Sequence, residues 1–332
     1  MKIDISAHIM PRKYVDAVAK KGSSRFQGTI QGTPTLVDLD SRFRIMDKYD
    51  DLVQVLTIAG PVESPVGAVA GHEASELAKI ANDAMAELTV RYPDRFIAAV
   101  ASLPLSDMDA ALKETDRAIG ELRFRGVLVN ASTHRKPIDG PEFMPLYQKM
   151  SEYNLPIWIH PWRLPIVPDY AGEEMSLYRI WHTWGWPYET TAAMTRLVFS
   201  GVLERYPNLK FVTHHCGAMI PFFEQRIVGC YDDAEMRRND KSKVGLTKHL
   251  LEYFRMFYAD TAVQGSTPAL MCGYAFFGAD HLLFGTDMPH DSQLGDRNIR
   301  ETIRSIEEMD IPASDKKKVF EDNARQLLRL PV

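Results

Sequence analysis

Short apolar runs alternate with longer amphipathic stretches along almost the whole chain. The runs lie at residues 2–8, 52–60, 95–104, 124–132, 156–161, 209–215, 256–263 and 281–289. Apolar runs of this length predict buried strands, and strands that alternate with helices predict a parallel sheet. Eight such units in one chain of 332 residues predict an α/β fold of the (β/α)8 TIM-barrel type, as a single domain over residues 1–332.

The stretches between the runs have helical spacing. Helices are predicted near residues 71–92, 107–122, 187–206, 296–309 and 314–330. A doubly wound open sheet is the competing architecture. It would more often carry a glycine-rich phosphate loop after its first strand, and no such loop follows residues 2–8.

The composition argues against nucleic acid and membranes as partners. The net charge of -5 and the pI near 6.1 give no electrostatic reason to expect nucleic acid or an anionic membrane as a partner. No apolar run approaches the roughly 20 residues that span a bilayer, and no secretory signal is evident. The three cysteines have no paired spacing, which suits reduced thiols, so a cytoplasmic protein is expected.

Residues 162–186 form an aromatic segment after the fifth predicted strand. They contain every tryptophan except Trp158. We interpret the segment as an insertion that covers the barrel mouth or meets another subunit. Exposure of Trp181, Trp184 and Trp186 on one monomer would leave an apolar patch, so we expect a homo-oligomer, or a hetero-oligomer with a related barrel subunit.

Histidines and aspartates gather at the ends of the predicted strands, where barrel enzymes carry their chemistry. They are His8, His160, His214, His215, Asp260 and Asp287. Packing alone does not require imidazoles to gather at one end of a barrel, whereas a metal site does. The pattern therefore favours a metal site at the carboxyl ends of the strands.

Three motifs extend this argument to a family. They are IHPW at 159–162, the stretch from PYETTAAM to FFEQRI at 187–227, and FGTDMP at 284–289. In this order the chain resembles the amidohydrolase superfamily, in the branch that includes aminocarboxymuconate semialdehyde decarboxylase and γ-resorcylate decarboxylase. The resemblance runs from KIDISAH to DNARQLL.

The resemblance implies roles for individual residues. His160 matches the metal-binding histidine that ends strand five, and Asp287 matches the strand-eight aspartate, a metal ligand and proton acceptor. His215 stands six residues before Pro221, the spacing of the family histidine beside the metal-bound water. His215 and Asp287 are accordingly the predicted catalytic residues.

The opening histidine pair of the family is incomplete here. His8 matches its second member, but Ser6 stands where the first is expected, which puts the usual ligand count in doubt. His8, His160 and Asp287 still make a three-ligand site with an open position, which suits catalytic zinc and equally non-haem iron. We expect one divalent ion, with zinc favoured over manganese or iron, and His215 as a fourth ligand or as the nearby base.

Two neighbours at the strand ends are discounted. His214 is expected to point away from His215 and to pack between sheet and helix, because successive side chains on a strand face opposite sides. Asp260 is expected more often to have a structural role than to touch the site. His290, just beyond strand eight, can line the entrance.

Three residues after strand five are predicted to bind substrate: Trp162, Arg163 and His182. Arg163 can form a bidentate contact with a substrate carboxylate, or it can be a solvated loop charge. The leading hypothesis is a metal-dependent decarboxylase or hydrolase that acts on a small carboxylated cyclic or aromatic molecule.

Two alternatives stay open. The chain can be a metal-binding subunit of a heteromeric amidohydrolase-related oxygenase with iron or manganese, as either its catalytic or its structural partner. A barrel without metal that serves as a scaffold is disfavoured, since the histidines of the pattern are retained. Expression of the chain alone distinguishes these hypotheses.

Overall fold

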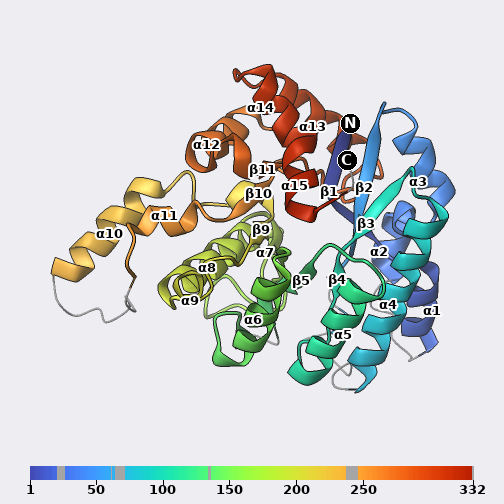
Figure 1. Ribbon diagram of the computed structural model, residues 1–332, viewed down its shortest axis with the longest axis horizontal. Coiled ribbons are helices and arrows are strands. Elements are labelled where there is room, and N and C mark those ends of the chain that lie inside the picture. Colours follow the sequence, from blue (N-terminus) through green and yellow to red (C-terminus); the bar gives the residue numbers. More distant parts are fainter. Residues whose placement is uncertain (21–26, 61, 64–71, 134–135, 237–245, 331–332) are drawn as a thin grey trace.

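Parallel strands surrounded by helices form the centre of the molecule (Figure 1). The computed structural model describes residues 1–20, 27–60, 62–63, 72–133, 136–236 and 246–330. The central strands are β1 (Lys2–Ile9), β2 (Leu52–Ile58), β3 (Phe96–Ala99), β4 (Ala101–Ser102), β5 (Val127–Asn130), β8 (Ile157–His160), β9 (Phe211–Thr213), β10 (Tyr258–Asp260) and β11 (Leu282–Leu283). Each corresponds to one of the apolar runs, with β3 and β4 sharing the third.

Parallel pairing gives the strand orders β1-β2-β3 and β11-β10-β9-β8-β5-β4. Val100 joins β3 to β4, and its N–H donates to the carbonyl of Leu56 at 2.9 Å. At the other junction, the N–H of Ile5 donates to the carbonyl of Phe284 at 2.9 Å. These bonds close the two sheets into one barrel, so the predicted TIM-barrel fold is confirmed.

Helices follow the strands and cover the outside of the barrel. Their bounds are α1 (Arg12–Lys20), α2 (Gln27–Gly32), α3 (Leu39–Met46), α4 (His72–Arg91), α5 (Met108–Gly120), α6 (Met144–Tyr153), α7 (Ile180–Thr183), α8 (Gly185–Phe199), α9 (Val202–Arg205), α10 (Glu224–Met236), α11 (Leu250–Phe254), α12 (Thr267–Phe277), α13 (Asp296–Glu307), α14 (Ala313–Lys317) and α15 (Asn323–Leu328). A π-helical turn, Lys318–Asp322, joins the last two. A short antiparallel pair, β6 (Ser132–Thr133) and β7 (Lys136–Pro137), follows β5.

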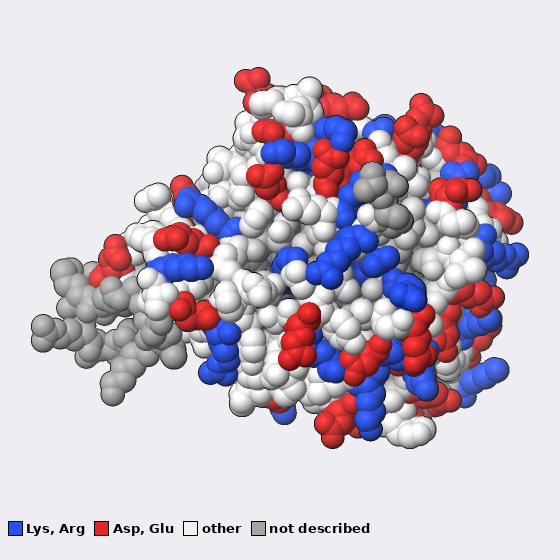
Figure 2. All heavy atoms as spheres, in the orientation of Figure 1, with Lys and Arg blue, Asp and Glu red and all other residues white. Residues whose placement is uncertain are grey.

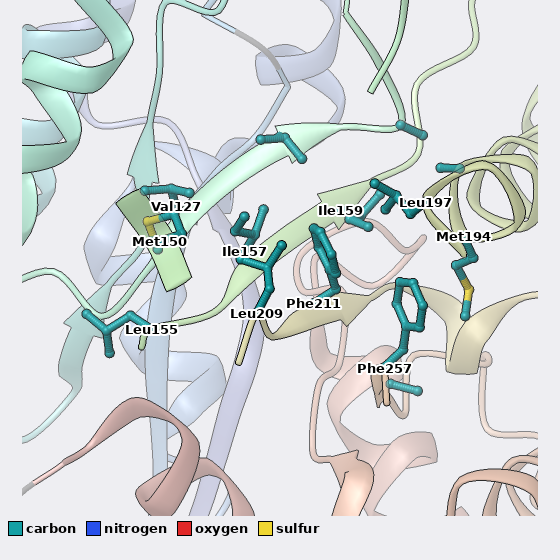
Figure 3. Packing of buried hydrophobic residues seen from close by; sticks show 14 of the residues in the cluster. Val127, Met150, Leu155, Ile157, Ile159, Met194, Leu197, Leu209, Phe211 and Phe257 are labelled. Atoms are coloured by element: carbon teal, nitrogen blue, oxygen red, sulfur yellow. The ribbon is translucent and has the colours of Figure 1, made fainter. Parts of the chain in front are cut away.

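Two apolar layers hold the strands in place. Outside the barrel, Ile159 and Phe211 on neighbouring strands pack with Met194 and Leu197 of α8 (Figure 3). Inside it, the indole N–H of buried Trp158 on β8 donates across to the carbonyl of Ile5 on β1 at 3.2 Å. Because this interior is filled, a site that binds a ligand is expected at the carboxyl ends of the strands.

The surface carries charges of both signs, interspersed over the face shown in Figure 2. Within the described ranges, no helix combines the length and apolar character needed to cross a membrane.

Candidate active site

His8, His160 and Asp287 meet at the carboxyl end of the barrel. His8 is fully buried, and its Nε2 lies 3.0 Å from Oδ1 of Asp287. The ring centroids of His8 and His160 are 5.1 Å apart. His160 Nδ1 lies 2.7 Å from the carbonyl of Pro161, an acceptor, so Nδ1 carries the proton and Nε2 keeps its lone pair. The structure therefore brings the three predicted ligands together.

His214 also belongs to this cluster. The prediction that it points away from the site and packs between sheet and helix is wrong. Its ring centroid is 4.8 Å from that of His160 and 5.9 Å from that of His8, and it is 1% exposed. Strand β9 ends at Thr213, before this residue. The alternation of side chains that applies within a strand therefore no longer decides where His214 points.

His215 lies at the edge of the cluster. Its ring centroid is 6.0 Å from that of His214, and the residue is half-buried. The chain has positive φ at His215 (56°) and again at Cys216 (55°), a conformation that non-glycine residues adopt rarely. Such backbone persists where the surrounding structure enforces it, and it is common at functional sites. His290 lines the same space, with its ring centroid 5.2 Å from that of His8.

Asp260 contacts the cluster and also pairs with its surroundings, so it combines the structural role that was favoured with a place at the site. Its Oδ2 accepts a hydrogen bond from Ser6 Oγ at 3.0 Å and lies 3.1 Å from His214 Nδ1. Gly285 allows this approach, since a Cβ there would be 2.9 Å from both Asp260 Cβ and Ser6 Oγ. Ser6 is thus fully buried and bonded to a carboxylate at the site.

A second group of buried polar side chains supports the first. Arg42, on α3, is fully buried and donates to the carbonyl of His8 at 2.8 Å and to Gln54 Oε1 at 2.9 Å. Asp4 accepts from the N–H of Thr286 at 3.0 Å and from its hydroxyl at 2.6 Å. These bonds connect β1 to the segment that carries Asp287. Neither side chain was singled out from the sequence, which offers no pattern that marks them.

Burial dominates the electrostatics of the cluster. It lowers the pKa of His160 well below the usual histidine value, and the neighbouring His214 and His8 lower it further. Burial also lowers the pKa of His215. For Asp287, burial alone would raise the pKa, but the contact with His8 outweighs it, and the pKa lies below the usual value. His160 and His215 are therefore neutral at pH 7, beside a charged carboxylate.

The donor atoms fit a divalent cation in kind. Within the part of the chain that the structure describes, His215 Nδ1 and His214 Nε2 are buried without a hydrogen-bond partner. His8 Nε2 and His214 Nδ1 face the carboxylates of Asp287 and Asp260 at 3.0 and 3.1 Å. Neutral imidazoles and carboxylates are the usual ligands of zinc and similar ions. Among the described residues, however, no three His, Cys, Asp or Glu side chains already stand in a closed metal-binding geometry. Binding would therefore require these side chains to rotate toward one point.

The aromatic segment adjoins the cluster through Trp186. Its ring centroid lies 5.5 Å from that of His160 and 4.4 Å from that of His182, so these rings form a wall beside the site. The Arg163 guanidinium pairs with Glu189 at 3.6 Å. Its predicted contact with a substrate carboxylate is untested, as is that of Trp162, which is half-buried.

Comparison with known proteins gives matches over nearly the whole chain. The family model described as Amidohydrolase matches residues 3–330. The γ-resorcylate decarboxylase of Polaromonas sp. strain JS666 is 30% identical, over 89% of this chain and 89% of that protein. The 2-amino-3-carboxymuconate-6-semialdehyde decarboxylase of Dictyostelium discoideum is 28% identical, over 99% of this chain and 92% of that protein.

One similar solved structure contains a metal. It is the dihydroxybenzoic acid decarboxylase of Polaromonas sp. JS666, with bound manganese and the inhibitor 2-nitroresorcinol. Its TM-score is 0.80 at 27% identity, with 99% of this chain and 97% of that chain covered. The likeness thus extends over the entire barrel.

Proposed function

The chain belongs to the amidohydrolase family, and on that premise we propose that it is a metal-dependent, non-oxidative decarboxylase of a hydroxylated aromatic acid. The observation that carries the proposal is the buried cluster of neutral imidazoles around Asp287, with the Trp186 ring beside His160. The relatives named above support the reaction, since they are decarboxylases of ring or ring-derived acids.

The proposed reaction needs no oxidant. The bond between the ring carbon and the carboxylate breaks, its electron pair stays on the ring carbon, and carbon dioxide leaves. One proton must then reach that carbon, so that arene carboxylate and proton give arene and carbon dioxide. The charge that develops on the ring has to be stabilised by fixed groups around it.

The side chains of the cluster suit these requirements. His215 is proposed to relay the proton to the ring carbon: it is neutral at pH 7 and must first take up a proton, and its lowered pKa then makes the imidazolium release that proton readily. Asp287 is charged, and it can take up a proton from a substrate hydroxyl. The rings of Trp186 and His182 offer flat surfaces against which an aromatic substrate can pack.

A divalent ion is proposed at His8, His160 and Asp287. When bound, such an ion supplies Lewis acidity that polarises a substrate oxygen. The choice of zinc rests on the donor set, and the manganese of the Polaromonas structure makes manganese the first alternative. Elemental analysis of protein purified without chelators distinguishes the two.

The test is an assay of purified chain against a panel of mono- and dihydroxybenzoates, with benzoate and simple amides as controls. Carbon dioxide release that requires a hydroxyl beside the carboxylate, and that is abolished by chelation, is expected. Amide hydrolysis without carbon dioxide release would contradict the proposal. Oxygen consumption that appears only after a second subunit is added would favour the oxygenase alternative.

A further inference from the structure

Ser6 and His214 meet at the same carboxylate. Asp260 Oδ2 accepts from Ser6 Oγ at 3.0 Å and lies 3.1 Å from His214 Nδ1. Ser6 occupies the position of the family's first histidine and cannot replace its imidazole. We propose that His214 supplies the missing ligand, so that His8, His160, His214 and Asp287 hold the divalent ion. This inference rests on the proposed function, since it requires the metal.

The position of the His214 ring agrees with a shared ion. Rings that bind one ion through nitrogen have centroids on the order of 5 Å apart, because each centroid lies about 3 Å from the ion. The His214 centroid is 4.8 Å from that of His160 and 5.9 Å from that of His8. The ring is 1% exposed, its Nδ1 faces Asp260 Oδ2 at 3.1 Å, and within the described residues its Nε2 has no hydrogen-bond partner. A buried imidazole in this state is costly unless it gains a ligand.

Asp260 is placed to orient that imidazole. Its Oδ1 accepts from the N–H groups of Cys216 at 3.3 Å and Ala262 at 3.1 Å, which fixes the carboxylate. Its Oδ2 faces Nδ1 of His214, which leaves Nε2 for the ion. A carboxylate behind a metal-binding histidine fixes the tautomer and raises the basicity of the ligand. Asp260 is therefore a positioning residue in the proposal.

The close surroundings of Ser6 favour a small side chain at position 6. A Cβ on Gly285 would come within 2.9 Å of Ser6 Oγ and 3.1 Å of Ser6 Cβ, and Asp260 fills the remaining side. A small side chain at position 6 fits beside Gly285 and hydrogen-bonds one side of the Asp260 carboxylate, and the His214 ring faces the same carboxylate oxygen.

The experiment measures divalent metal binding to chelator-treated full-length chain. The proteins are wild type, His214→Ala, His214→Gln and the matched control His72→Ala, which removes an exposed imidazole. Dissociation constants for Mn²⁺ and Zn²⁺ come from competition with a chelator, and the visible absorption of bound Co²⁺ reports the ligand set. Both His214 variants are expected to weaken binding by at least about tenfold and to change the Co²⁺ spectrum, whereas His72→Ala changes neither.

A compensating variant tests directly whether His214 stands in for a ligand at position 6. Ser6→His combined with His214→Ala should recover part of the affinity and the wild-type Co²⁺ spectrum. Unchanged affinity and spectrum in both His214 variants would overturn the inference while leaving the proposed function intact, as would lower thermal stability with an unaltered spectrum. A wild-type chain that binds no divalent ion would instead overturn the proposed function itself.

Discussion

Two regions rich in rings lie at the carboxyl end of the barrel, the histidine cluster and the aromatic segment that follows β8, and they differ in what holds them. The histidine cluster is fixed by buried contacts to Asp260, Asp287 and the strand ends. The aromatic segment 162–186 leaves several large apolar side chains exposed, among them Ile166, Tyr170, Met175, Leu177, Tyr178 and Trp184. Reactive groups are held rigidly by the barrel, whereas the segment beside them retains surface for further contacts.

Loss of His8 is expected to have the largest effect. His8→Ala removes a proposed ligand from the rigid region, so the chain should lose most of its bound metal, a weakening of the order of 100-fold or more. Elemental analysis after gel filtration measures it, with His72→Ala as the control. A His8→Ala protein that keeps one full equivalent of metal would show that His8 is only a buried core histidine.

An added methyl group is expected to destabilise the protein in the first region and not in the second. Gly285→Ala places a Cβ 2.9 Å from Asp260 Cβ, so overpacking should cost about 1–3 kcal/mol of unfolding free energy. Gly172→Ala, within the aromatic segment, meets no atom within 4 Å and should change stability by no more than about 0.5 kcal/mol. Urea denaturation of both variants measures the difference. Equal unfolding free energies of the two variants would mean that the surroundings of Gly285 accommodate a methyl group as easily as the aromatic segment does.

The strand pattern predicted the barrel because apolar runs and helical spacing are local properties of the sequence. Strand ends then located His8, His160 and Asp287, since carboxyl ends of parallel strands converge at one end of a barrel. The extent of the single domain, residues 1–332, stays a prediction. The stretch from Tyr231 to Ser242 is polar and charged, which predicts an exposed excursion; it begins within helix α10, and residues 237–245 lie outside the described residues.

Long-range contacts escaped the pattern. His214 was misplaced because the alternation rule was applied one residue beyond the end of β9. Asp260 and Ser6 meet across 254 positions of sequence, which no periodicity encodes. Arg42 reaches the carbonyl of His8 from helix α3. In the sequence it looks like an ordinary charged residue of an amphipathic helix. Such contacts depend on how the strands are arranged around the barrel, and this arrangement follows from global packing.

The exposed segment offers a separate test of assembly. Trp184 is 64% exposed, while Trp181 and Trp186 are already half-buried within the chain. If the segment contacts another subunit, Trp184→Ser should weaken association by about tenfold without changing metal content. Sedimentation at several concentrations measures this, with exposed Val90→Ser as the control. A stable wild-type monomer at micromolar concentration would contradict the expected oligomer.

The smallest expected effect on stability concerns Asp4, one of the buried polar side chains that support the histidine cluster. Burial raises the pKa of Asp4 above its usual value, although the hydrogen bonds from Thr286 oppose this. A carboxyl group whose pKa is raised by folding stabilises the native state below its unfolded pKa, and that contribution is lost as the pH rises through the folded value. Asp4→Asn abolishes this titration while keeping the shape of the side chain.

The unfolding free energy of Asp4→Asn relative to wild type should therefore become more favourable as the pH rises above the usual carboxyl range, because only wild type loses stability as Asp4 ionises. Chemical denaturation of metal-free protein at several pH values measures this change. If the difference in unfolding free energy between Asp4→Asn and wild type does not vary with pH, folding does not raise the pKa of Asp4. Water would then reach this carboxyl group in the folded protein.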